Sequence, residues 1–433
     1  MRILHVSTRL ILGGSQENTV LSCEEQSRRG HDVHLAFGPI LGPEGSLLSR
    51  VQNFRTPDGA TITTHQVPHL LREIAPLADI RARRELRTLI ARLKPNVVHT
   101  HSSKAGILGR LAAWDAWRDL ARDPTTRNPI AIVHTIHGPP FMPIEGGLAQ
   151  QLKIRALNHA YTLAERKAAV HCDAIVSVAD AMTQQFLARG IGSPDLYTTV
   201  RSGMEVAPFL NPAPGETREQ MRAKLNLAPD DFVIGTVARL AQHKGHDDLI
   251  HAVAPRLESD PSWRLLWVGD GWWRERLLAH ARTRGFTVSE LDKPDAPRPP
   301  NARLLVTGLV PPERIPGLIR AMDVLAHPSY REGLPRTVPQ ALLAGVCPVA
   351  YDVDGTREAC QDERTGLLVR VGDVAALRSA LERLYAHPDE RQHWANTGRE
   401  WCANAFSVEA MVDGLDAVYA QALELSRERL ASI

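Results

Sequence analysis

The chain has 433 residues, of which 43% are hydrophobic and 23% charged, and its formal net charge at pH 7 is +2. This length suits two domains better than one core, and the near balance of charge gives no reason to expect a nucleic-acid partner. The apolar stretches are too short to cross a bilayer, and the first residues lack the cleavage pattern of a signal peptide. We therefore expect a cytoplasmic globular protein.

The cysteines give no sign of a disulfide framework. They are five in number, scattered, and without a C-x-x-C pair, which also argues against a structural zinc site. We expect buried, reduced side chains at Cys23, Cys172, Cys347, Cys360 and Cys402.

Apolar runs of strand length alternate with helical patterns through the first half. RILHVS at residues 2–7 is followed by a Gly-Gly loop and a helical segment that stops at Gly30. Further helical patterns cover the amphipathic segment 80–94 and the stretch near 150–170. Further strands are expected at 31–38, 96–102, 130–138, 172–179 and 198–204. This alternation predicts a doubly wound parallel sheet.

The second half repeats the scheme after a break. Residues 207–231 are rich in Pro, Glu and Asp, and strand-like runs resume with FVIGTVARL at residues 232–240. Asp373 can cap a later helix, and the segment from Ser407 has apolar residues at helical spacing. We expect domains at 1–205 and 206–405, a terminal helix at 406–433, and a ligand cleft at the ends of the two sheets.

Two loops after predicted strands suit an anionic ligand. Arg239 and Lys244 follow the strand that opens the second half, where two cations can hold a diphosphate, although both can equally be solvated surface cations. Gly13 and Gly14 follow the first strand, where glycine lets a phosphate or sugar approach a helix N-terminus. Gly-Gly is also a common tight turn, and the pattern does not match the dinucleotide fingerprint G-x-G-x-x-G.

Histidines gather at two strand ends of the first half, at His99, His101, His134 and His137. His99 and His101 face one side of a strand, as a metal pair would, but no nearby carboxylate or cysteine completes a site, so we expect no metal. His137 lies where a strand opens into a loop. It is the better candidate for a substrate contact, and the alternative is a structural role.

Two further features have an ordinary interpretation and a functional one. The D-x-D of Asp352 and Asp354 is expected to form a turn, although such a pair can hold a divalent cation against a diphosphate. The basic helix at 80–94 is expected to pack one face and solvate the other. Its alternative is contact with an anionic membrane surface or a lipid-linked acceptor.

These pieces together resemble the family 4 retaining glycosyltransferases of the GT-B fold, over essentially the whole chain. The resemblance rests on the order of the motifs: GG, HSSKAG, HTIHG, RSGMEV, ARLAQHKG, VGDG, VTGLV, HPSYREGLPRT and AGVCPVAYDVDG. It implies two Rossmann-like domains facing across a cleft, with the terminal helix crossing back onto the first. It also implies transfer from a nucleotide-diphosphate sugar, UDP-linked in our expectation, to a glycan, lipid-linked or small-molecule acceptor, without metal or cofactor.

The resemblance also implies roles for single residues. Arg239 and Lys244 would hold the diphosphate and stabilise the charge that develops on it, and His137 would lie near the transferring sugar. The other expected contacts are Glu332 and the backbone of Gly333 and Leu334 at the sugar hydroxyls, the backbone of Leu309 and Val310 at the base, and Gly13 and Gly14 near the phosphates.

One position departs from the family pattern. The second glutamate of the motif that begins at Glu332 is here Gln340, which keeps the length and one acceptor oxygen but loses the charge. We expect weaker binding of the donor's ribose and no change in the chemical step. Two alternative functions stay open: a nucleotide-sugar-binding protein without turnover, and a nucleotide-sugar epimerase of the same fold.

Overall fold

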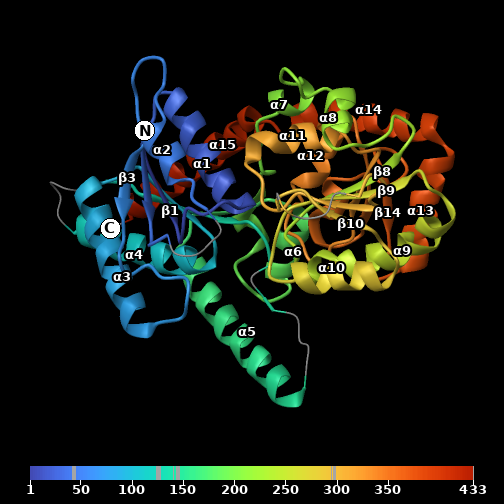
Figure 1. The fold of residues 1–433 in the computed structure, drawn as a ribbon. Helices are drawn as coiled ribbons and strands as arrows, with labels where there is room; N and C mark the ends of the chain where they lie inside the picture. The colour runs from blue at the N-terminus through green and yellow to red at the C-terminus, as the bar shows by residue number, and fades with distance from the viewer. Residues whose placement is uncertain are drawn as a thin grey trace. The chain divides into compact units, whose positions relative to one another are not determined.

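The computed structural model describes residues 1–40, 45–122, 128–139, 141–142, 147–293, 295 and 299–432. The chain forms two compact units, Met1–Met204 with Val408–Ile433, and Glu205–Ser407 (Figure 1). In the described part, each unit contains one seven-stranded sheet whose neighbouring strands are all parallel. The predicted α/β fold of two doubly wound domains is confirmed.

The sheet of the first unit has the order β3-β2-β1-β4-β5-β6-β7. Its strands are β1 (Arg2–Ser7), β2 (Asp32–Phe37), β3 (Thr63–Gln66), β4 (Val97–His101), β5 (Ala131–Ile136), β6 (Ala174–Ser177) and β7 (Tyr197–Thr199). Its helices are α1 (Gly14–Arg28), α2 (Leu48–Asn53), α3 (Pro76–Leu93), α4 (Ser103–Ala121), α5 (Leu148–Ala169), α6 (Asp180–Leu187) and α15 (Val408–Ala431). The strand order reverses between β1 and β4, which is where ligands of such sheets bind.

Side chains alternate between two differently covered faces of this sheet. Leu4 of β1 and Val98 of β4 pack in a core with residues of α3 and α4. Ile3 and Val97, one position earlier on each strand, pack in a core with α15. Positions 5, 99 and 101 therefore face the α15 side of the sheet, because strand side chains alternate with period two.

The sheet of the second unit has the order β10-β11-β9-β8-β12-β13-β14 and reverses between β8 and β12. Its strands are β8 (Phe232–Val237), β9 (Trp263–Val268), β10 (Val288–Glu290), β11 (Leu304–Val306), β12 (Val324–His327), β13 (Cys347–Tyr351) and β14 (Leu367–Val369). Its helices are α7 (Ala207–Leu210), α8 (Arg218–Lys224), α9 (His246–Ser259), α10 (Arg274–Thr283), α11 (Ile315–Arg320), α12 (Thr337–Leu343), α13 (Val374–Ala386) and α14 (Pro388–Ala405).

Several local expectations can be compared with the structure. Asp373 caps α13 by accepting a hydrogen bond from the backbone of Ala376 at 2.9 Å. Strands β3 and β10 were not expected, because the first reads Thr-Thr-His-Gln and the second has only three residues, and both lie at sheet edges. The basic helix begins at Pro76, earlier than the basic run itself.

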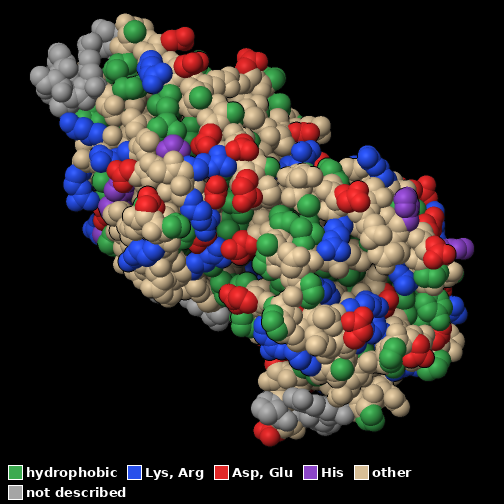
Figure 2. Space-filling view, turned by 90° about the horizontal axis from the view of Figure 1, so that it is seen from above, with side chains coloured by type: hydrophobic (Ala, Val, Ile, Leu, Met, Phe, Trp, Pro, Cys, Tyr) green, Lys and Arg blue, Asp and Glu red, His purple; other side chains and the backbone are tan. Residues whose placement is uncertain are grey.

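The surface and the cysteines show ordinary features. Lysine and arginine are interspersed with aspartate and glutamate over the face seen in Figure 2, in keeping with the small net charge. No helix among the described residues is long and apolar enough to span a membrane. The five cysteines are free thiols, four of them buried and Cys172 partly so.

Candidate functional site

In the second unit, the loops after β8 and β12 meet at the point where the strand order reverses. The backbone N–H of Tyr330 donates to the carbonyl of His243 at 2.8 Å. Gly245 has φ = 68°, and a Cβ added there would lie 1.9 Å from the carbonyl oxygen of Pro328. Only glycine therefore allows the two loops to approach this closely, and the loops bring two predicted site residues together.

The two residues are Lys244 and Glu332. Nζ of Lys244 lies 2.5 Å from Oε1 of Glu332, and Nε2 of His327 lies 2.9 Å from the same oxygen. His327 in turn lies 3.2 Å, through Nδ1, from the hydroxyl of Thr337 at the start of α12. The sequence alone did not point to His327, because a histidine at a strand end becomes informative only once folding has placed it beside Glu332.

The surroundings of Glu332 keep it ionised. Burial alone would raise the pKa of this carboxyl, but the charges of Lys244 and His327 and their hydrogen bonds outweigh burial, and the pKa is held well below its usual range. Its backbone N–H donates to the carboxylate of Asp354 at 2.8 Å. Glu332 is thus an ionised and oriented carboxylate that can accept further hydrogen bonds.

Arg239 differs from Lys244 in having no ion pair with a described residue. Its side chain is exposed, and its guanidinium lies 5.4 Å from the centre of the Trp272 ring. The VGDG loop packs beneath this segment: a Cβ on Gly269 would lie 2.2 Å from the carbonyl oxygen of Ala238. The loop after β8 therefore carries two cations: Lys244, which forms an ion pair with Glu332, and Arg239, which forms none with a described residue.

The other predicted donor contacts lie on the segments after β11 and β12 and on α12. Leu309 is 62% exposed and Val310 half-buried, both just after β11, while Gly333 and the buried Leu334 follow Glu332 directly. Gln340 is half-buried on α12, and its amide has no hydrogen-bond partner among the residues described. The amide is therefore not used within the described part of the fold.

The D-x-D segment has internal partners. Asp352 pairs with Arg357, and Asp354, at φ = 47°, accepts the hydrogen bond from the backbone of Glu332. Both carboxylates thus shape the turn after β13, as the turn interpretation expects.

In the first unit, a cavity of about 340 Å³ opens at the carboxyl ends of β4 and β5. His137, Ser102 and Ser103 line it, together with Ser15, which follows Gly14 in the first turn of α1. The Gly-Gly loop and His137 are thereby brought to one place. Gly13 is extended, at φ = −177°, so the loop needs no left-handed residue there.

A buried ion pair lies at this cavity and was not predicted. Arg110 of α4 contacts Glu165 of α5 at 2.5 Å, with both side chains fully buried, and Glu165 lines the cavity. The two residues are 55 positions apart and on different helices, so no motif connects them in the sequence. Each charge offsets the other in a place where a single one would be costly.

The comparisons with known proteins agree with this architecture. The family description "Glycosyl transferases group 1" matches residues 217–401, and "Glycosyl transferase 4-like domain" matches residues 13–203. In the Anabaena protein HepE, solved with UDP and glucose, the fold is similar over 96% of this chain and 98% of that one, with a TM-score of 0.72 and 18% identity.

Two curated relatives are also similar. One is the UDP-Gal:alpha-D-GlcNAc-diphosphoundecaprenol alpha-1,3-galactosyltransferase of Escherichia coli, 25% identical over 97% of this chain and 96% of the relative. The other is the putative glycosyltransferase EpsD of Bacillus subtilis, 26% identical over 76% and 78%. The two parallel sheets with their loop sites define a GT-B glycosyltransferase. The chain belongs to the group 1, family 4 glycosyltransferases.

Proposed function

We propose that this glycosyltransferase takes its sugar from a nucleotide-diphosphate sugar, UDP-linked, and transfers it with retention of configuration and without a metal ion. The contact of Lys244 with Glu332 carries the proposal, because it joins a phosphate-binding cation to an ionised acceptor for sugar hydroxyls. The nucleotide in the HepE complex and the UDP-galactose named for the Escherichia coli relative support this donor class.

The chemistry expected at this site is electrostatic. Breaking the sugar–phosphate bond builds negative charge on the departing diphosphate and positive character on the sugar. Arg239, Lys244 and the N-terminus of α9 can stabilise the diphosphate, since α9 begins directly after Gly245. The departing phosphate would accept the proton of the acceptor hydroxyl on the same face, which gives retention without an enzyme nucleophile.

The acceptor would bind on the first unit. Its cavity is lined by the hydroxyls of Ser15, Ser102 and Ser103 and by the carboxylate of Glu165, groups that suit a polyhydroxylated molecule. His137 would approach the transferring sugar from there. The glycan, lipid-linked or small-molecule class of the acceptor follows the relatives: the name of the Escherichia coli relative specifies a diphosphoundecaprenol-linked sugar.

We also propose a peripheral contact with the cytoplasmic face of a membrane through α3. Leu77 and Ile80 in its first turns are 76% and 51% exposed, and the exposed cations Arg81 and Arg84 follow on the same helix. Apolar and basic side chains together suit an anionic bilayer surface. Replacing Leu77 and Ile80 by serine should reduce co-sedimentation with vesicles that contain anionic lipid. Unchanged binding would contradict this part of the proposal.

The donor assignment is tested by the double variant Arg239→Ala with Lys244→Ala. Wild-type protein should show a thermal shift of several degrees with one class among uridine, guanosine and adenosine diphosphate sugars, and should transfer or slowly hydrolyse that donor in EDTA. The double variant should lose the thermal shift and the turnover of the donor. The control Arg364→Ala, at an exposed cation of the same unit, should keep both. Full activity of the double variant would overturn the assignment, and an inverted anomer in the product would overturn retention.

A further inference from the structure

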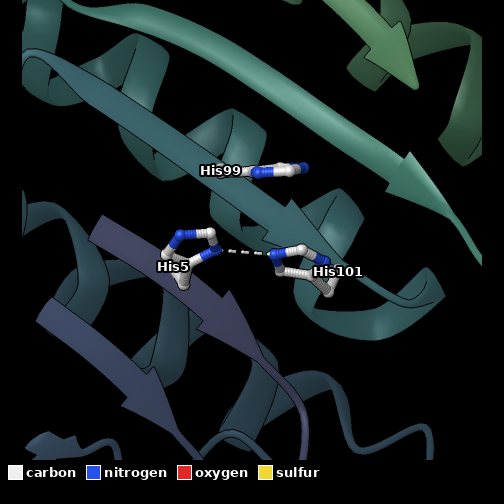
Figure 3. A group of neighbouring side chains, drawn as sticks. All are labelled: His5, His99 and His101. Atoms are coloured by element: carbon white, nitrogen blue, oxygen red, sulfur yellow. Dashed lines mark hydrogen bonds between the residues drawn. The ribbon is translucent and has the colours of Figure 1, made fainter. Parts of the chain in front are cut away.

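Three buried histidines lie side by side on the α15 face of the first sheet. His5 comes from β1, and His99 and His101 come from β4; their exposed fractions are 0%, 0% and 1%. Figure 3 shows the rings of His5 and His101 pointing toward one another, with His99 above them. Burying polar rings without partners would be costly, so their hydrogen bonds must be accounted for.

The rings belong to a chain of hydrogen bonds that reaches His137. Oε1 of Gln26, on α1, lies 2.7 Å from Nε2 of His5. Nδ1 of His5 lies 2.9 Å from Nε2 of His101, and Nδ1 of His101 lies 3.1 Å from Nε2 of His137. Each of the two inner rings therefore uses both of its nitrogens.

A side branch ties the chain to the terminal helix. Nε2 of Gln26 donates to the hydroxyl of Tyr419 on α15 at 3.2 Å, and this hydroxyl lies 2.6 Å from Nδ1 of His99. Nε2 of His99 lies 2.6 Å from the hydroxyl of Thr135. The amide of Gln26 thus contacts His5 through its oxygen and Tyr419 through its nitrogen.

The orientation of Gln26 decides which nitrogen of every following ring carries the proton. Burial lowers the pKa of His5 to about 4 and holds the pKa of His101 well below its usual value, so both rings are neutral and have one N–H each. Nε2–H of His5 must donate to Gln26, so its Nδ1 accepts from Nε2–H of His101. By the same step His101 accepts from Nε2–H of His137, and a neutral His137 ring then has no proton on Nδ1.

A shared metal ion is the alternative explanation of such a cluster, since the ligand atoms of His5, His99 and His101 lie within 4.8 Å of one another. The ring of His99 lies over that of His101, with centroids 4.2 Å apart and planes 36° apart. Both nitrogens of His99 also have partners in Tyr419 and Thr135.

We propose that His5 and His101 are positioning residues, which hold the ring of His137 in one orientation and one tautomer, with Nε2–H turned inward and Nδ1 as the hydrogen-bond acceptor at the cavity. His137 then accepts a hydrogen bond from a hydroxyl of the transferring sugar instead of donating one. The hydrogen bond between His137 and the sugar rests on the proposed function. The tautomer itself is a property of the protein alone.

The first test is NMR on protein labelled with ¹⁵N-histidine, without substrate. Two-bond ¹H–¹⁵N correlations distinguish the tautomers, and His137→Gln identifies the signal. His137 should show an Nε2–H ring in the wild type and a mixture in His101→Leu. His101→Gln should preserve the wild-type pattern, because an amide can donate to His5 and accept from His137. His34→Leu, which breaks a separate pair with His65 at 3.0 Å, should leave the signal unchanged.

Kinetics supply the second readout. His101→Leu should lower the kcat for sugar transfer about tenfold, the equivalent of about one ordinary hydrogen bond, while His101→Gln stays close to the wild type. A wild-type His137 spectrum in His101→Leu, or one bound metal per chain in the purified wild type, would overturn the proposal. A lost tautomer with unchanged turnover would confirm the positioning of His137 and overturn its assigned part in transfer.

Discussion

Gln340 stands one helical turn after Thr337 on α12, and Thr337 contacts the His327 that holds Glu332. The position is thus linked to Glu332 through its own helix. Because the amide has no partner among the residues that the structure describes, its place in the fold is consistent with a ligand contact. We retain the interpretation that it contacts the ribose of the donor.

Gln340→Glu should therefore lower the KM for the donor and leave kcat almost unchanged. A carboxylate forms charge-assisted hydrogen bonds with ribose hydroxyls, about twice as strong as neutral ones, so a decrease of about fivefold is expected. The measurement is steady-state kinetics with the donor varied, and Gln392→Glu on the exposed side of α14 serves as control. A large rise in kcat alone would show that residue 340 acts on the bond being broken.

At the scale of residues, the sequence predicts which residues belong to the candidate site better than it predicts their contacts. Lys244 and Glu332 were both chosen from motifs, and the structure places them in contact. His327 and the pair of Arg110 with Glu165 were missed, because their roles depend on neighbours that folding brings from distant segments. The inner histidines at 99 and 101 were noticed as a possible metal pair, whereas their partners Gln26 and His5 carry no local signal.

At the scale of elements, two loops of the second unit depend on glycine for their closeness. Gly245 directly precedes α9 in the left-handed conformation and closely approaches the backbone of Pro328 in the loop after β12. Gly285, after α10, is also left-handed, at φ = 80°, but a Cβ there would meet nothing within 4 Å. Alanine at Gly285 would cause only backbone strain, whereas alanine at Gly245 would cause strain and a steric clash.

Gly245→Ala should therefore destabilise the protein more than Gly285→Ala does, and it alone should raise the donor KM. The control carries only the conformational penalty, about 1–2 kcal/mol, whereas the site variant must also move the loops that hold Lys244 and Glu332. Denaturant unfolding and donor kinetics measure the two effects. Equal losses of stability together with an unchanged KM would show that the loop contact is not needed for binding.

The terminal helix shows which elements periodicity predicts well. Eight of the fifteen buried residues in one core of the first unit come from α15, and their helical spacing was visible in the sequence. The seven remaining residues of that core lie on α1, the strands and the segment after β7, so the helix completes the sheet face. The sequence pattern predicts the helix, but only the resemblance predicted where it packs.

At the scale of the molecule, buried neutral histidines are unequally shared between the units. The first unit holds His5, His99, His101 and His134 fully buried, and the second holds His246. Burial is the main cause in each case: it lowers the pKa of His5 to about 4 and of His246 to about 3, and holds the other three pKa values well below the usual one. The first unit therefore depends more strongly on pH.

The stability of the first unit should fall first as the pH decreases from 6.5 to about 4. The unfolded chain binds protons at these histidines below pH 6.5 while the folded unit does not, so their stabilising effect is complete above pH 6.5 and is lost below it. Each histidine contributes up to about 1.4 kcal/mol per pH unit. Hydrogen exchange at pH 7.5 and 5.5, corrected for intrinsic rates, should show β1, β4 and β5 losing protection before β8, β9 and β12. Earlier loss of protection in the second unit would contradict this account. The carboxyl of Glu332, in that unit, takes up a proton in the unfolded chain only near pH 4.5, so its effect on stability begins at a lower pH.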